Sequence, residues 1–212
     1  MLKITIKMSY MPNLANPSFA ESTQPVEPPE VLIDHMTLYH GSATPGITEM
    51  LPADEYTVGT GVYLTDNPNN AAGYARRSAY GTKTNEGIVY AVGINNMKLA
   101  NLDNPDKLQE VMEGFSGKLT EQLSTLDEKD WLRRSVLERT LEAIQLGVMP
   151  GQVKNVTQSC SDLFTKYLSR LGYDGLKTQE GGETGFVGNH SSYVIFDPSK
   201  TTVEGNQEVQ IS

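Results

Sequence analysis

Short apolar runs separated by polar segments characterise the chain, and their order predicts strands early and late with helices between them. The runs at residues 36–40 (MTLYH), 61–65 (GVYLT) and 87–94 (GIVYAVGI) are rich in β-branched and aromatic residues, which is typical of buried strands. A last strand is expected at residues 192–197 (SYVIFD), ended by Pro198. This order predicts the α+β class.

A first helix is expected at residues 67–81, directly after the second strand. Asp66 or Asn67 is a suitable N-cap, because a short polar side chain there accepts a hydrogen bond from the first helical turn. Pro68 falls in the first turn, where its missing N–H costs nothing.

Further apolar positions recur at helical spacing and predict two more helices. One pattern ends at Gly147 and the other at Gly172, which is expected to be a C′ glycine. We interpret both stripes as core packing. The stripe residues are Leu132, Val136, Leu141, Ile144, Cys160, Leu163, Phe164, Tyr167, Leu168 and Leu171.

The domain organisation predicted from these patterns is an N-terminal arm, residues 1–36, and one domain, residues 37–212. Residues 12–30 hold five prolines and few large apolar side chains, so a linker or extended arm is expected there. Residues 105–155 form a helical insertion in the domain.

Composition and charge exclude several classes of protein. The formal net charge is -9, so the chain as a whole does not attract nucleic acid or an anionic membrane surface. Cys160 is the single cysteine, which excludes an intramolecular disulfide and a cysteine-based zinc site, and no metal site is expected. No run approaches the roughly 18 apolar residues of a membrane span. We therefore expect a cytoplasmic location and no membrane partner.

Two tyrosines and a histidine are the first candidates for chemistry. His40 ends the first predicted strand and is followed by Gly41, whose missing Cβ lets a ligand approach the backbone. Tyr63 lies in the next strand and Tyr74 in the helix after it, so the two rings are placed to stack on a flat ligand ring. The alternative for each is an ordinary turn or core residue.

Four stretches together resemble the ADP-ribosyltransferase family, in its diphtheria-toxin and poly(ADP-ribose) polymerase-like branch. They are YHGS (39–42), GVYLTDNPNNAAGYA (61–75), LGYDGL (171–176) and SYVIFDPSK (192–200). The resemblance covers roughly residues 37–100 and 160–203. It implies a split antiparallel β-sandwich with NAD as a substrate. The branch carries a histidine, a tyrosine and usually a glutamate on three separate strands.

The resemblance also implies roles for the first motifs. His40 would hold the adenosine-side ribose of NAD, and Gly41 would bond the nicotinamide carboxamide through its backbone. Tyr63 and Tyr74 would stack on the two faces of the nicotinamide. The helix position that often offers a hydroxyl to the carboxamide is Ala71 here, and Ser42 is a candidate to supply that contact.

The main departure from the family concerns the glutamate, because its position at the start of the last strand holds Ser192. A serine bonds a ribose hydroxyl but carries no charge, which argues against long-chain polymer synthesis. Glu183, in the loop before that strand, is our candidate to supply the carboxylate. The alternative is that the loop residues are solvated. Other polar residues of this loop are Gln179, Glu180, Asn189 and His190.

The expected function is that of a mono-ADP-ribosyltransferase that acts as a toxin, in phage defence or as a phage effector. It would cleave NAD, release nicotinamide and transfer ADP-ribose to a protein or a nucleic acid. One alternative is a toxin that modifies RNA or DNA bases and is neutralised by an antitoxin partner. Another is a catalytically inactive module that binds NAD or ADP-ribose. The sequence does not identify the acceptor or the partner.

Overall fold

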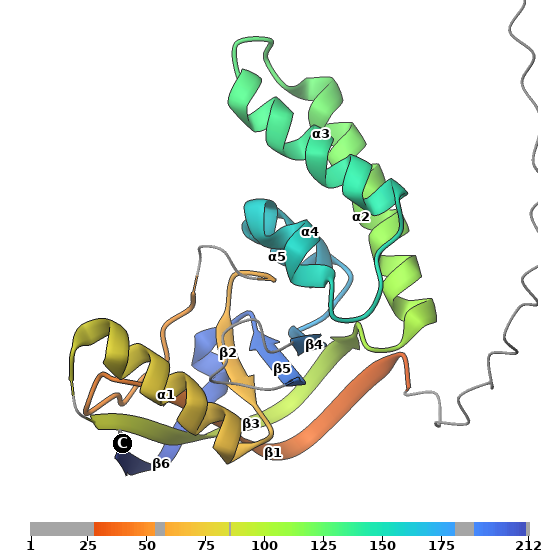
Figure 1. The fold of residues 1–212 in the computed structure, drawn as a ribbon. Coiled ribbons are helices and arrows are strands. Elements are labelled where there is room, and N and C mark those ends of the chain that lie inside the picture. Colours follow the sequence, from red (N-terminus) through yellow and green to blue (C-terminus); the bar gives the residue numbers. More distant parts are fainter. Residues whose placement is uncertain (1–27, 54–57, 85, 181–188, 211–212) are drawn as a thin grey trace, which may run out of the picture.

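The computed structural model describes residues 28–53, 58–84, 86–180 and 189–210. Figure 1 shows their arrangement, with one helix on the strands and the others gathered at the far end of the molecule. The elements in chain order are β1 (Glu30–Ser42), β2 (Val62–Thr65), α1 (Pro68–Thr82), β3 (Glu86–Asn101), α2 (Pro105–Thr125), α3 (Trp131–Gln145), α4 (Val153–Thr157), α5 (Ser161–Arg170), β4 (Gly175–Glu180), β5 (His190–Ile195) and β6 (Thr201–Gln210).

The strands form one hydrogen-bonded sheet that closes on itself. Their order is β1-β2-β5-β4-β3-β6, and β1 also pairs with β3. The long β3 makes this closure possible, since it pairs along most of its length with β1 and pairs at its end with β4. The α+β class is therefore confirmed, whereas a sandwich of two separate sheets is not.

Several local predictions are confirmed. The Asn67 side chain caps α1 by accepting a hydrogen bond from Asn69 N at 2.9 Å, with Pro68 in the first turn. Gly147 and Gly172 have φ of 94° and 85°, the left-handed conformation that glycine adopts without strain after a helix.

The structure differs from two of the expectations. β1 begins at Glu30, inside the segment assigned to the arm, because pairing with β3 runs from that residue. The core-packing interpretation is wrong for Leu132 and Leu171, which are 63% and 46% exposed. Leu132 lies at the start of α3, where the α2–α3 hairpin extends away from the strands (Figure 1).

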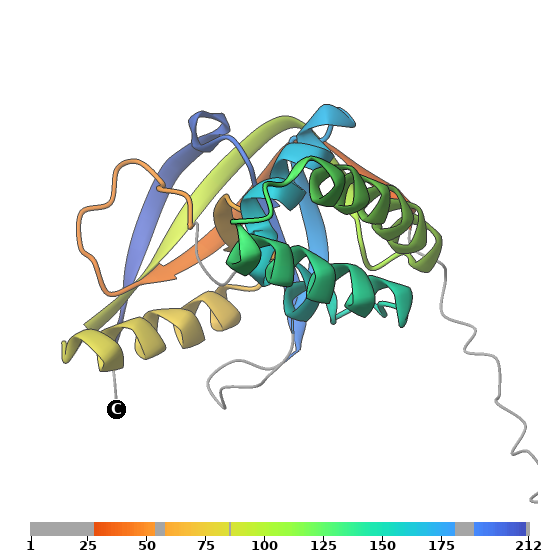
Figure 2. The ribbon, with the colours of Figure 1, turned by 90° about the horizontal axis from the view of Figure 1, so that it is seen from above.

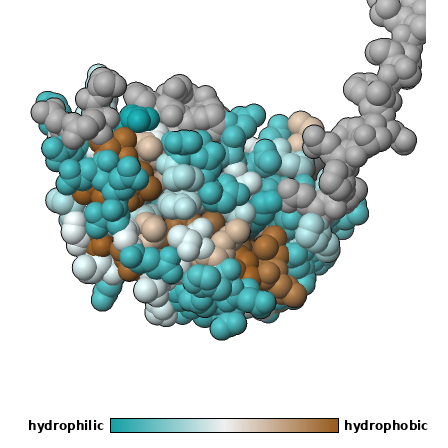
Figure 3. All heavy atoms as spheres, turned by 90° about the horizontal axis from the view of Figure 1, so that it is seen from below, coloured by the Kyte–Doolittle hydropathy of each residue, from teal (hydrophilic) through white to brown (hydrophobic). Residues whose placement is uncertain are grey.

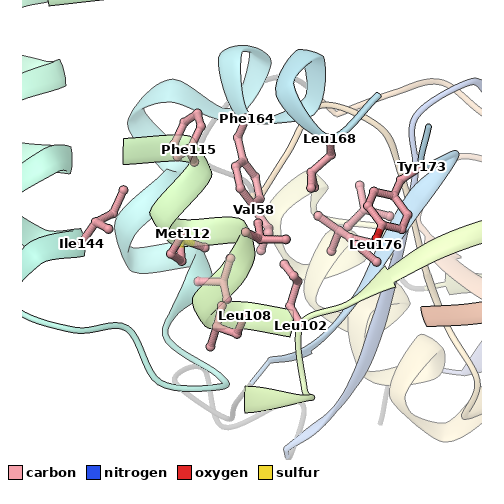
Figure 4. Packing of buried hydrophobic residues seen from close by; sticks show 14 of the residues in the cluster. Val58, Leu102, Leu108, Met112, Phe115, Ile144, Phe164, Leu168, Tyr173 and Leu176 are labelled. Carbon is pink, nitrogen blue, oxygen red and sulfur yellow. The ribbon is translucent and has the colours of Figure 1, made fainter. Parts of the chain in front are cut away.

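The helical end of the molecule has its own apolar core. Side chains from α2, α3 and α5 meet the segment around Val58 and the inner side of β4 (Figure 4). Phe115 of α2 and Phe164 of α5 are fully buried and pack edge to face, with ring centroids 4.9 Å apart. This core fixes β4 against the helical insertion. A second cluster lies among β1, β2, β3 and β5.

A short turn joins α5 to β4 and ties three strands together. Asp174 accepts a hydrogen bond from Lys98 N of β3 at 2.9 Å and pairs with Lys200, just before β6. Its backbone carbonyl accepts from Phe196 N, directly after β5. The GYDG stretch therefore holds the corner of the sheet.

The described part of the chain has no helix long and apolar enough to cross a membrane. On the face drawn in Figure 3, apolar residues form separate patches among polar ones. Figure 2 shows α1 lying apart from the other helices. It is the helix that carries the candidate site.

Candidate functional site

Two glycines allow α1 to lie directly on the strands. A Cβ added to Gly41 of β1 would stand 1.9 Å from the Ala71 carbonyl oxygen, and one added to Gly87 of β3 would stand 2.8 Å from Ala75. Such distances are impossible for real atoms, so only glycine fits. Gly41 is therefore required for helix packing, a reason other than the ligand approach expected from the sequence.

Tyr74 of this helix reaches a group of polar side chains on β4 and β5. Its hydroxyl lies 3.1 Å from His190 Nε2 and donates to Glu180 Oε2 at 3.4 Å. The Ser192 hydroxyl donates to the same carboxylate oxygen at 2.9 Å and lies 3.2 Å from His190 Nε2. The Tyr74 and His190 rings also meet edge to face, with centroids 5.5 Å apart. We call Tyr74, Glu180, His190 and Ser192 the polar cluster.

Strand register explains why these residues share one face of the sheet. Glu180 pairs with His190, and Thr178 pairs with Ser192, on antiparallel strands. Side chains two residues apart on a strand point to the same side. Thr65 of β2 pairs with Ser192 from the other side. The Thr178 hydroxyl is buried below the cluster without a hydrogen-bond partner among the described residues.

The protons of the polar cluster can be assigned from its donors. Burial, the charge of Glu180 and the hydrogen bond to it raise the pKa of Tyr74 far above its usual value, so Tyr74 remains a donor. Ser192 and Tyr74 each have one hydroxyl hydrogen and give it to Glu180. With both hydroxyl hydrogens directed to Glu180, the contacts of His190 Nε2 with the hydroxyl oxygens require the tautomer that has a hydrogen on Nε2.

His40 is largely buried and is held by the next strand. Its Nδ1 lies 3.0 Å from the Tyr63 carbonyl oxygen, and a carbonyl only accepts, so Nδ1 carries the proton. Burial lowers the pKa of His40, and the hydrogen bond to Tyr63 offsets part of this effect. The ring is neutral at neutral pH, with Nε2 as an acceptor.

Tyr63 is anchored through its hydroxyl to the loop before β2. The hydroxyl donates to Gly59 O at 2.9 Å and accepts from Gly59 N at 3.1 Å. It is close enough to Tyr74 to raise the pKa of Tyr74 further. That the rings of Tyr63 and Tyr74 stack on a ligand stays a prediction.

The structure brings Tyr74 and Ser192 together and places His40 and Tyr63 on the adjoining strands. Ser42 is the last residue of β1, and its hydroxyl accepts from Thr44 N in the following turn at 3.0 Å. Glu183 lies outside the described residues. Across the ranges that the structure describes, no group of three or more histidine, cysteine, aspartate or glutamate side chains is placed to hold a metal ion.

The expectation of a polar loop is wrong for Glu180 and His190, which are the last residue of β4 and the first of β5. The stretch GLKTQE has one large apolar residue, too few for a strand signal. Only the pairing of β4 with β5 puts the Glu180 carboxylate beside Ser192.

Comparisons with known proteins identify no family. No family model matches the chain, and no curated protein does. A chain of a solved structure, the toxin–antitoxin complex MbcT–MbcA of M. tuberculosis, has a similar arrangement. Its TM-score is 0.43 at 10% identity, over 84% of this chain and 87% of the other. A likeness at this level carries no argument about function.

Proposed function

We propose that the chain is a mono-ADP-ribosyltransferase that cleaves NAD, releases nicotinamide and transfers ADP-ribose to a macromolecule. The observation that carries the proposal is the polar cluster, in which a carboxylate, two hydroxyls and an imidazole converge beside Tyr63. Tyr63, Tyr74 and Ser192 all belong to motifs that resemble the family.

The described residues divide the work as follows. Neutral His40 offers Nε2 to a ribose hydroxyl, since Nδ1 is already bonded to Tyr63 O. Tyr63 and Tyr74 offer ring faces to the planar nicotinamide. The polar cluster lies where charge develops on the nicotinamide-side ribose as its bond to nicotinamide breaks. Together these contacts would hold NAD so that the ribose carbon is positioned for attack by the acceptor.

The acceptor is a protein or a nucleic acid, and the toxin part of the proposal rests on the resemblance of the motifs alone. The net charge of -9 favours a protein acceptor, because long-range attraction to a phosphate backbone is missing. A toxin of this kind requires a neutralising antitoxin. Coexpression with the product of a neighbouring gene, followed by copurification, tests that partner.

Tyr63 provides the test of the proposed function. Tyr63→Leu removes the aromatic face, which we expect to lower nicotinamide release about fivefold or more, because ring stacking contributes about 1 kcal/mol or more. Tyr80→Leu is the matched control, since Tyr80 is 77% exposed at the end of α1. Release is measured with purified protein and NAD labelled in the nicotinamide ring.

Two outcomes would contradict the proposal. One is unchanged release in a folded Tyr63→Leu protein. The other is a wild-type protein that binds NAD and releases no nicotinamide, which would make the chain a binding module.

A further inference from the structure

We propose that Glu180, at the end of β4, is the catalytic carboxylate of this chain. The inference rests on the proposed function and deepens it. The resemblance assigns a glutamate to the start of β5, where this sequence has Ser192. Glu180 supplies the missing charge from the neighbouring strand, and Ser192 positions it.

The register between β4 and β5 brings the Glu180 carboxylate next to Ser192, the position at which the family has a glutamate. Glu180 is paired with His190, two residues before Ser192 on the antiparallel strand. Its Oε2 accepts the Ser192 hydroxyl at 2.9 Å. The long acidic side chain of Glu180 therefore reaches the short side chain of Ser192. This places the negative charge beside the residue that replaces the family glutamate.

One oxygen of the Glu180 carboxylate accepts hydrogen bonds from the protein, and the other is available to a substrate. Oε2 receives both hydroxyls of the polar cluster, from Ser192 and Tyr74. Oε1 has no hydrogen-bond partner in the part of the chain that the structure describes. The two hydrogen bonds fix Oε2 and leave Oε1 able to accept a hydrogen bond from a ribose hydroxyl.

The chemistry of the reaction requires such a group. The bond between the ribose C1′ and the nicotinamide nitrogen breaks, and its electron pair leaves with nicotinamide. The sugar becomes oxocarbenium-like until the acceptor atom bonds C1′ and loses its proton to solvent. A fixed negative charge stabilises the developing cation, and a hydrogen bond from the 2′-hydroxyl to Oε1 orients the ribose.

A pair of glutamine variants tests the assignment. Glu180→Gln keeps the shape of the side chain and removes the charge, so kcat for nicotinamide release should fall on the order of 10²-fold or more, with KM nearly unchanged. Glu208→Gln, on the exposed face of β6, removes the same charge elsewhere and should leave turnover at the wild-type value. Thermal unfolding of each variant is measured alongside.

A second pair of variants covers the case in which Glu180→Gln does not fold. Glu180→Asp keeps the charge on a shorter side chain and should retain more kcat than any neutral variant. Ser192→Ala tests the positioning role, with an expected loss in kcat of about tenfold, equivalent to roughly 1.4 kcal/mol, and an unchanged KM. A structural role alone would not separate kcat from KM.

The outcomes distinguish the inference from the function on which it rests. Wild-type turnover in a folded Glu180→Gln protein overturns the assignment and leaves the transferase intact. The assignment is equally overturned if Glu183→Gln abolishes turnover while Glu180→Gln does not, or if Ser192→Ala costs more than Glu180→Gln. A wild-type protein without any nicotinamide release would instead remove the proposed function.

Discussion

His40 is largely buried near the end of β1, one residue before Gly41. Its Nδ1–H donates to the Tyr63 carbonyl oxygen of β2. β1 and β2 share a single residue pair in register, Tyr39 with Thr65. The His40 side chain is therefore an additional bond between two strands that backbone pairing joins only briefly.

The lowered pKa of His40 predicts how stability depends on pH. The ordinary value is 6.5, and burial lowers it in the folded protein. As the pH falls below about 6.5, the unfolded state binds a proton that the folded state rejects, so the free energy of unfolding decreases. This contribution is fully present above pH 6.5 and is lost toward the folded pKa.

Urea unfolding at pH 7.5 and pH 5.0 measures the effect. His40→Gln retains a polar side chain and does not titrate, so its loss of stability between the two pH values should be smaller than that of the wild type. An identical loss in both proteins would show that His40 is not the group responsible. The remaining histidines, His35 and His190, are present in both.

Among the elements, the position of α1 decides whether the site is assembled, because Tyr74 is the member of the polar cluster that comes from this helix. Gly41 and Gly87 let the helix approach β1 and β3 closely. Ala71 and Ala75 are the helix residues at these contacts and are fully buried. A shift of α1 away from β1 and β3 would therefore move the Tyr74 hydroxyl away from Glu180.

Gly41→Ala should destabilise the protein by about 1–3 kcal/mol or more, since overpacking forces the backbones apart. Gly81→Ala, in α1, is the control. A Cβ there meets nothing within 4 Å, so it should be neutral or stabilise by up to about 1 kcal/mol through helix propensity. Chemical denaturation gives both values. Equal stability of the two variants would contradict this close packing.

Sequence patterns predicted the elements that bury apolar side chains and missed those that do not. The strand at 87–94 was recognised because nearly every residue of it is apolar, and it makes up the first half of β3. β6 was missed because Val203 and Val209 are its only large apolar residues. Among the residues that the structure describes it pairs with β3 alone, so backbone hydrogen bonds determine it more than side chains do.

At the scale of the whole molecule, the closed sheet determines which residues that are distant in the sequence come into contact. The sequence indicated Tyr74 and Ser192 through motifs that resemble the family, 118 positions apart by their numbers. It did not place Glu180 beside them, because that requires the register between β4 and β5. Candidate residues were therefore predictable one at a time, whereas their contacts depended on tertiary pairing.

The central claim is that this closed sheet assembles a site that breaks NAD and transfers part of it. Parallel reactions with NAD labelled in the nicotinamide ring or in the adenylate part test it most directly. The full-length protein is incubated with cell extract in both. The account predicts equal amounts of free nicotinamide and of adenylate label bound to macromolecules, with the bound label released by either protease or nuclease. NAD that remains intact in the presence of the folded protein and extract would contradict it.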